Sequence, residues 1–201
     1  MPEAAEDIPD KILAPSDEEL ARRAKTGDSA ALDQLVRRHQ PEVTRLLWRF
    51  ARRPADLQDL VQDAFLRIVR GLPGWRAEQP FIHWLRRLTV NVGRDYCRRE
   101  TVRRRWTSEP MADTDDDHAF VPEAVEPGAD PAARAAAIEI KDFLAELPPD
   151  DRTLLTLHHL EGWDFASIGR HLGWSTPVTK LRAFRARRRL RARLLSNESA
   201  L

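Results

Sequence analysis

Residues 107–130 divide this chain into two parts and so limit what it can fold into. The segment reads TSEPMADTDDDHAFVPEAVEPGAD and is acidic and rich in proline, which is typical of a flexible linker. The 201 residues are therefore expected to form two small modules rather than one large core. The expected division is a disordered acidic tail at 1–15, a first module at 16–106, an acidic linker at 107–131, a second module at 132–195 and a short tail at 196–201.

Charge is strongly segregated along the chain, although the net charge is only +1. Residues 20–106 carry a net charge of +11 and residues 152–201 one of +7. Residues 1–19 carry −6 and residues 107–151 carry −11. Basic modules separated by acidic segments favour a polyanionic partner, but ordinary solvated helix faces explain the pattern equally well.

The first module is predicted to be all-α. Ser16 with Glu19 forms a capping box, and Pro54 suits the first turn of a later helix. Pro41 is expected to bend the helix between them. A further helix is expected from Phe81 to about residue 105. No segment shows the sustained alternation of a strand.

The second module is predicted to contain a helix-turn-helix. Helices are expected at about 132–147, 150–161, 164–172 and 176–195, with a tight turn at Gly173. Such a motif binds duplex DNA by placing its second helix in the major groove. The alternatives are a solvated basic helix or an RNA-binding arm, which would not need the spacing of Ile168, Leu172 and Gly173.

No motif in the sequence indicates catalysis. There is no phosphate-binding loop, dinucleotide fingerprint, zinc-protease motif or nucleophile elbow, so we expect no enzyme and no cofactor. Cys97, the only cysteine, is more simply a helix residue than a redox sensor, and a metal role for His158 and His159 is disfavoured. No run is long and apolar enough to span a membrane, and the acidic N-terminus is unlike a signal peptide, so a cytoplasmic protein is expected.

Aromatic residues lie beside arginines in the loop before the helix at 81–105 and along that helix. Aromatic faces stack on unpaired bases while arginines follow the backbone, so Trp75, Trp84 and Arg87 suggest contact with single-stranded DNA. Phe81 and Trp84 could equally be core residues.

Three motifs together resemble bacterial RNA polymerase sigma factors of the extracytoplasmic function type. They are Asp59-Leu60-Val61-Gln62-Asp63-Ala64-Phe65-Leu66-Arg67, the stretch from Trp84-Leu85 through Asn91 and Asp95 to Arg98-Arg99, and the later set Leu147-Pro148, Leu160-Glu161-Gly162, Ile168-Gly169 and Leu172-Gly173. The resemblance implies that the first module binds the clamp coiled coil of core RNA polymerase and opens the minus-ten promoter element. It also implies that the second module contacts the beta flap and reads the minus-thirty-five element, and that an anti-sigma factor restrains the protein.

The resemblance also implies roles for individual residues. The residues expected to bind the polymerase are Asp59, Leu60, Gln62, Asp63 and Leu66. Those expected at the minus-ten element, on promoter DNA that becomes single-stranded, are Trp75, Arg76, Glu78, Trp84, Arg87, Asn91, Arg94 and Arg98. Those expected at the minus-thirty-five duplex are Ser175, Thr176, Lys180, Arg182 and Arg185.

This chain departs from the typical family pattern in three places. The loop reads Arg76-Ala77-Glu78-Gln79-Pro80 where Arg-Gly-Glu-Ser is usual, and Ile168-Gly169 replaces Ile-Ala. The second helix of the helix-turn-helix reads Pro177-Val178-Thr179-Lys180-Leu181-Arg182-Ala183 where Gly-Thr-Val-Lys-Ser-Arg-Leu is usual, so its buried stripe is expected to be rotated or thinner. The rival reading is a helix-turn-helix regulator that acts without binding the polymerase.

Overall fold

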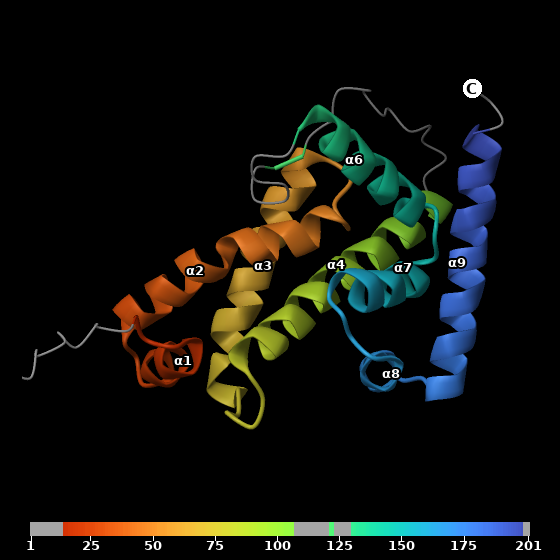
Figure 1. The fold of residues 1–201 in the computed structure, drawn as a ribbon. Helices are drawn as coiled ribbons and strands as arrows, with labels where there is room; N and C mark the ends of the chain where they lie inside the picture. The colour runs from red at the N-terminus through yellow and green to blue at the C-terminus, as the bar shows by residue number, and fades with distance from the viewer. Residues whose placement is uncertain (1–13, 107–120, 123–129, 199–201) are drawn as a thin grey trace, which may run out of the picture.

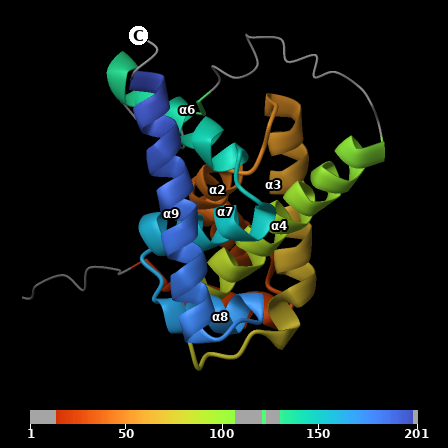
Figure 2. The same ribbon diagram turned by 90° about the vertical axis from the view of Figure 1, so that its right-hand side faces the viewer.

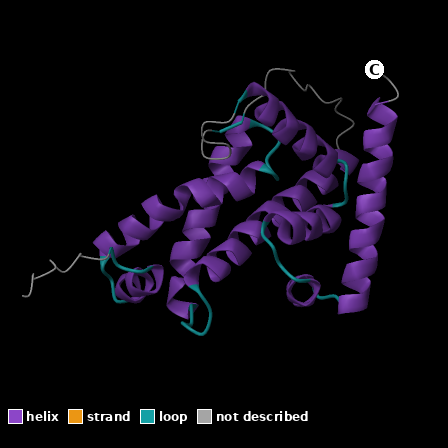
Figure 3. Cartoon of the chain, viewed as in Figure 1, coloured by secondary structure: helices purple, strands orange, loops and turns teal. Residues whose placement is uncertain are grey.

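The structure, a computed structural model, describes residues 14–106, 121–122 and 130–198. Within these ranges all regular elements are helices, as predicted (Figures 1 and 3). Most of the expected linker and of the N-terminal tail lie outside the described residues. The α-helices are α1 (Asp17–Lys25), α2 (Ser29–Trp48), α3 (Pro54–Gly71), α4 (Phe81–Trp106), α6 (Pro131–Ala145), α7 (Pro149–Leu155), α8 (Phe165–Leu172) and α9 (Thr176–Glu198).

Helices α1 to α4 pack around one apolar core. Ser16 caps α1, where its hydroxyl oxygen accepts a hydrogen bond from the Glu19 N–H at 3.1 Å. Helix α2 continues through Pro41, so the expected bend does not divide it, and Pro54 opens α3 as predicted. Fully buried Leu20 and Val43 belong to this core, which fixes α3 and α4 as a rigid support for any surface they carry.

The second module follows the predicted boundaries closely. A short π-helix (Thr156–Leu160) ends the segment begun by α7, where a single helix was expected. Gly173 has a left-handed backbone with φ of +76°, which ends α8 and starts the tight turn into α9. Helix α9 extends to Glu198, three residues beyond the expected end.

Gly169 lies where α8 approaches the start of α9. A Cβ at this position would lie 2.7 Å from the Trp174 carbonyl oxygen and 2.9 Å from Thr179 Oγ1. The glycine lowers the helix propensity of α8, but it allows an approach that alanine would block.

The two modules pack against each other. Helix α7 lies beside α4, and α9 runs along the outer side of α7 and α8 (Figures 1 and 2). One apolar cluster joins Phe50 and Val90 of the first module to Leu154 and Leu157 of the second. The sequence divides the modules at the linker, but they share this part of their core.

Candidate functional site

The outer face of α3 carries most of the residues expected to bind the polymerase. Asp59 and Gln62 are exposed, and Leu66 is 46% exposed although it is apolar. Leu60 differs from the expectation, because it is only 4% exposed and packs in the core of the first module. Asp59, Gln62, Leu66 and the half-buried Asp63 therefore form the accessible face, and Leu60 supports it from beneath.

Asp63 is held in place by its neighbours. Its carboxylate pairs with Arg67 one turn later at 3.0 Å, and Arg67 also pairs with Asp95 of α4 at 2.9 Å. Arg67 thus links the acidic face of α3 to α4.

The loop before α4 encloses a small pocket. The pocket has a volume of about 220 Å³ and is lined by Gly74, Trp75, Arg76, Glu78, Gln79, Trp84 and Arg87. Arg76, Glu78 and Arg87 are exposed at its rim. Trp75 and Trp84 are only 2% and 9% exposed, so they serve as its buried wall and not as free stacking platforms. Phe81 is also core, at 1% exposed.

Helix α1 fixes the shape of this loop. The Lys25 ammonium donates a hydrogen bond to the Trp75 carbonyl oxygen at 2.8 Å. The Glu18 carboxylate accepts one from the Phe81 N–H at 3.1 Å, at the start of α4. The indole N–H of Trp75 is buried and has no hydrogen-bond partner among the described residues. The hydrogen bonds of Lys25 and Glu18 therefore preform the pocket.

Two arginines of α4 that were expected near the melted strand point to the second module instead. Arg94 Nε donates to Asp150 Oδ1 at 2.8 Å, and Arg98 Nη2 lies 3.1 Å from the same carboxylate. Burial alone would raise the pKa of Asp150, but its hydrogen bonds to Arg94 and Arg98 and their charges hold that pKa below its usual value. Asn91, on the same helix, is half-buried.

Helix α9 presents part of the expected minus-thirty-five surface. Lys180, Arg185 and Ser175 are exposed, and Thr176 is half-buried at the first turn. Arg182 is instead turned toward α7. Its guanidinium donates to Asp151 Oδ1 at 2.8 Å and lies 4.2 Å from the centre of the Trp174 ring.

The buried face of α9 consists of small side chains. Thr179, Ala183 and Ala186 are fully buried and lie about one turn apart. The buried stripe is thus thin, as the departures in the sequence suggested.

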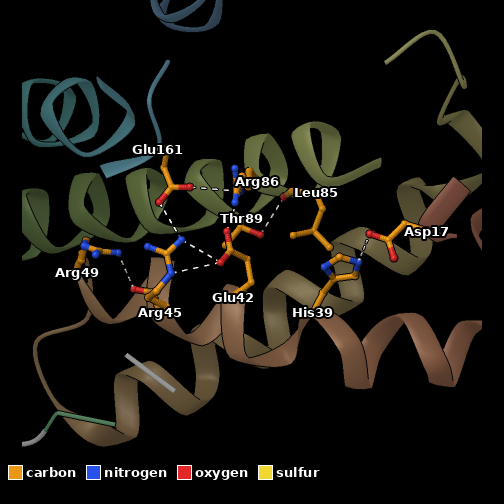
Figure 4. A network of polar contacts seen from close by, with 9 residues as sticks. All are labelled: Asp17, His39, Glu42, Arg45, Arg49, Leu85, Arg86, Thr89 and Glu161. Atoms are coloured by element: carbon orange, nitrogen blue, oxygen red, sulfur yellow. Dashed lines mark hydrogen bonds and ion pairs between the residues drawn. The ribbon is translucent and has the colours of Figure 1, made fainter. Parts of the chain in front are cut away.

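Sequence reasoning missed the acidic residues that hold the modules together. Glu161 is the most buried of them, with a side chain 1% exposed between Arg45 at 3.2 Å and Arg86 at 3.3 Å (Figure 4). Glu42 pairs with the same two arginines. Burial raises the pKa of Glu161 although both arginines oppose this. The only signal in the sequence was the acidic block ending in Asp150 and Asp151, which gave no hint of the partners.

Arg152 is a second buried charge at the module boundary. It is 4% exposed, donates to the Arg49 carbonyl oxygen, and contacts Cys97 Sγ at 3.8 Å. Its guanidinium carbon lies 5.6 Å from the centre of the Phe50 ring. Burial raises the pKa of the Cys97 thiol, which suits a packing residue better than a reactive one.

Two features are absent from the described residues. In the described part of the chain, no three His, Cys, Asp or Glu side chains are grouped so that they could hold a metal ion. Among the helices of residues 14–106 and 130–198, none is long and apolar enough to cross a membrane.

Comparison with known families accounts for both modules. Residues 35–103 match sigma-70 region 2, and residues 137–190 match sigma-70 region 4. The two matches, in this order along the chain, define a sigma-70-type transcription initiation factor.

Relatives place the chain more narrowly. It is 35% identical to the ECF RNA polymerase sigma factor SigM of Mycobacterium tuberculosis over 90% of this chain and 85% of that protein. It is 30% identical to the ECF RNA polymerase sigma-E factor of Haemophilus influenzae over 86% of this chain and 92% of that protein. The solved structure of CnrH in complex with the cytosolic domain of CnrY matches 90% of this chain and 99% of that chain, with a TM-score of 0.61 and 26% identity.

The chain therefore belongs to the extracytoplasmic function sigma factors of RNA polymerase. It is an alternative sigma factor that directs RNA polymerase to promoters. The rival reading, a regulator that acts without the polymerase, gives way to this assignment.

Proposed function

We propose that the accessible face of α3 binds the clamp coiled coil of core RNA polymerase. An exposed acidic and apolar face in a module of net charge +11 is better matched to a protein than to DNA. Leu66 and Val69, which are 46% and 39% exposed, supply the apolar centre, and Asp59 and Asp63 supply the charge. The ion pairs of Arg67 orient this face before binding.

The pocket of the loop before α4 captures one unstacked base of the minus-ten element. Its volume of about 220 Å³ suits a single base, and exposed Arg76 and Arg87 stand at its rim for the phosphates. The preformed loop, held by the hydrogen bonds of Lys25 and Glu18 of α1, is the observation that carries this proposal, because a base can then enter without the cost of ordering the loop.

Helix α9 enters the major groove of the minus-thirty-five element. The tight turn at Gly173 places Lys180 and Arg185 on its outer side, where they reach phosphates or base edges. Arg182 joins them only after it leaves Asp151.

The packed arrangement withholds part of this DNA-binding surface. Asp150 occupies Arg94 and Arg98 of the first module, and Asp151 occupies Arg182 of the second. Releasing Arg94 and Arg98 for promoter DNA therefore requires the modules to separate at the contact of α4 with α7, whereas Arg182 and Asp151 both belong to the second module and must part within it. The expected domain boundaries near 106 and 131 provide the linker for this movement.

The protein acts by binding and not by catalysis, in the cytoplasm where RNA polymerase works, and needs no cofactor. An anti-sigma factor is its expected restraint. The solved structure of the sigma factor RpoE of Bartonella quintana, which has a TM-score of 0.58 and 19% identity, is a complex with the anti-sigma factor NepR. We carry that class of partner over as part of the proposal.

Binding to the polymerase tests the assignment of α3. Asp59→Arg should abolish co-elution of the protein with bacterial core RNA polymerase in size-exclusion chromatography, because it reverses the charge of an exposed residue without breaking an ion pair of the core. Asp33→Arg, an equal charge reversal at an exposed position of α2, is the control and should co-elute like the wild type. Equal co-elution of both variants would show that the clamp binds another face.

A further inference from the structure

The outer face of α9 is apolar at the place where a DNA-reading helix is expected to be polar. Val178, Leu181 and Phe184 are 44%, 47% and 57% exposed. They recur every three residues, so they form a stripe along this face. With 3.6 residues per turn, Leu181 lies opposite the buried Thr179, Ala183 and Ala186, at the centre of the outer face.

Positive charge flanks this apolar stripe. Lys180 is exposed beside it, and the exposed Arg185 and Arg188 continue the same face toward the C-terminus. A second copy of the chain would bring these cations against one another, and three side chains cover far less than the roughly 800 Å² per partner of a stable protein interface. An apolar stripe between cations instead suits a surface that combines phosphates with methyl groups.

We propose that Leu181, with Val178 and Phe184, contacts the C5-methyl groups of thymines in the major groove of the minus-thirty-five element, and so makes this protein prefer thymine there. The inference rests on the proposed entry of α9 into that groove. The thymine methyl is the apolar group that a base pair exposes in the major groove, and apolar side chains read it by direct contact. Lys180 and Arg185 would supply affinity for the backbone on either side.

The departures in the sequence give this preference to this chain in particular. The typical family pattern places Thr and Ser at the positions of Val178 and Leu181. A hydroxyl can donate or accept a hydrogen bond at a base edge, whereas Val178 and Leu181 can only exclude water and pack. The recognition of this promoter element should therefore depend less on hydrogen bonds and more on methyl groups.

The test measures binding of the complete holoenzyme to promoter DNA. The minus-thirty-five element is first selected from a random library by the holoenzyme, and each of its thymines is then replaced by deoxyuridine, which removes only the methyl group. At least one replacement should weaken wild-type binding about fourfold, the value for one lost methyl contact. Holoenzyme with Leu181→Ser should bind DNA with thymine and DNA with deoxyuridine at that position equally, because the methyl group then has no partner. Phe184→Ala should have the same effect at a neighbouring base.

Two further variants separate this inference from the proposal on which it rests. Leu181→Met keeps an apolar side chain and should keep the preference for thymine. Arg185→Ala should weaken binding equally to thymine and deoxyuridine, because it acts on phosphates. Suppose that Arg185→Ala weakens binding, but that no replacement of thymine by deoxyuridine weakens binding of the wild type. In that case α9 does enter the groove, and the proposed contact with thymine methyl groups is wrong.

Other results overturn the inference as well. A selected element without thymine on either strand would do so directly. Unchanged discrimination in Leu181→Ser, Phe184→Ala and Val178→Thr would show that the stripe does not read the methyl groups. If Lys180→Ala and Arg185→Ala also leave binding unchanged, the placement of α9 in the groove fails too.

Discussion

Replacing Asp150 by asparagine should loosen the packing between the two modules. The Asp150 carboxylate lies at the first turn of α7 and binds Arg94 at 2.8 Å and Arg98 at 3.1 Å. Asparagine keeps the shape of the side chain and one acceptor oxygen, but it removes the charge that both arginines face. The change therefore acts on one electrostatic contact and leaves the apolar packing in place.

The size of the effect follows from the burial of the partners. Arg94 is 16% exposed and Asp150 is 22% exposed, so their hydrogen bond is poorly screened. Arg98 is 52% exposed and contributes little. A hydrogen bond to a charged group contributes about 1.5 to 3 kcal/mol. We therefore expect Asp150→Asn to weaken the packing of the two modules by about 2 kcal/mol, which makes the fraction of molecules with separated modules roughly 30-fold larger.

Cys97 provides the assay, because it is the only cysteine and lies at the boundary that must open. It is 8% exposed and touches Arg152, and burial raises its pKa, so it should react slowly with a thiol reagent while the modules are packed. The rate of modification at fixed pH then follows the open fraction. Asp150→Asn should raise this rate roughly 30-fold, and added salt should raise the wild-type rate more than that of the variant.

Glu19→Gln is the matched control, since Glu19 pairs with Arg22 within α1, away from the module boundary, and their side chains are 44% and 59% exposed. Its rate should equal that of the wild type. The reasoning is refuted if Asp150→Asn also reacts at the wild-type rate. It is equally refuted if wild-type Cys97 reacts as fast as in the unfolded chain.

Two further predictions concern stability. Burial lowers the pKa of Lys141 to about 8 despite its place over the Trp48 ring, so below pH 8 folding carries the cost of a buried charge. Lys141→Met should therefore raise the free energy of unfolding at pH 7 by about 1 to 3 kcal/mol. In paired urea titrations this advantage should shrink as the pH rises from 8 to 10.5, because wild-type Lys141 is neutral when folded but still charged when unfolded. An advantage that does not vary with pH would contradict the buried charge. Gly169→Ala should lower the unfolding midpoint and cost about 1 to 3 kcal/mol, since its Cβ would meet the Trp174 carbonyl at 2.7 Å. Thermal melts followed by circular dichroism would measure the shift in the unfolding midpoint. A higher midpoint in Gly169→Ala would contradict the close approach of α8 to the start of α9.

The helices could be predicted because their signals are local. Ser16, Pro54 and Gly173 mark ends by side-chain chemistry or backbone freedom, and the structure places ends at all three. The π-helix at 156–160 has no such signal in its sequence. The accessible face of α3 was predicted by the family resemblance, and Leu60 is its exception, because its side chain is turned into the core.

The packing of the modules could not be predicted from the sequence. Asp150 and Arg94 are 56 residues apart, and Glu161 and Arg45 are 116 apart, so no local pattern links them. Trp84 was open to either interpretation for a related reason, because aromatic residues beside arginines occur both on base-stacking surfaces and in cores. Only the fold shows that the rings of Trp84 and Trp75 form a buried wall of the pocket.

The burial of Glu161 limits which first and second modules can be combined in a chimeric sigma factor. Its charge is tolerated because Arg45 and Arg86 of the other module lie within 3.3 Å. If the same second module were joined to a first module that lacks these arginines, it would carry a buried carboxylate without a positive partner. Such an unpaired buried charge typically lowers stability by about 3 to 5 kcal/mol. Chimeric factors with exchanged promoter specificity should therefore carry over Arg45 and Arg86, or replace Glu161 by glutamine, for the hybrid to pack as this protein does.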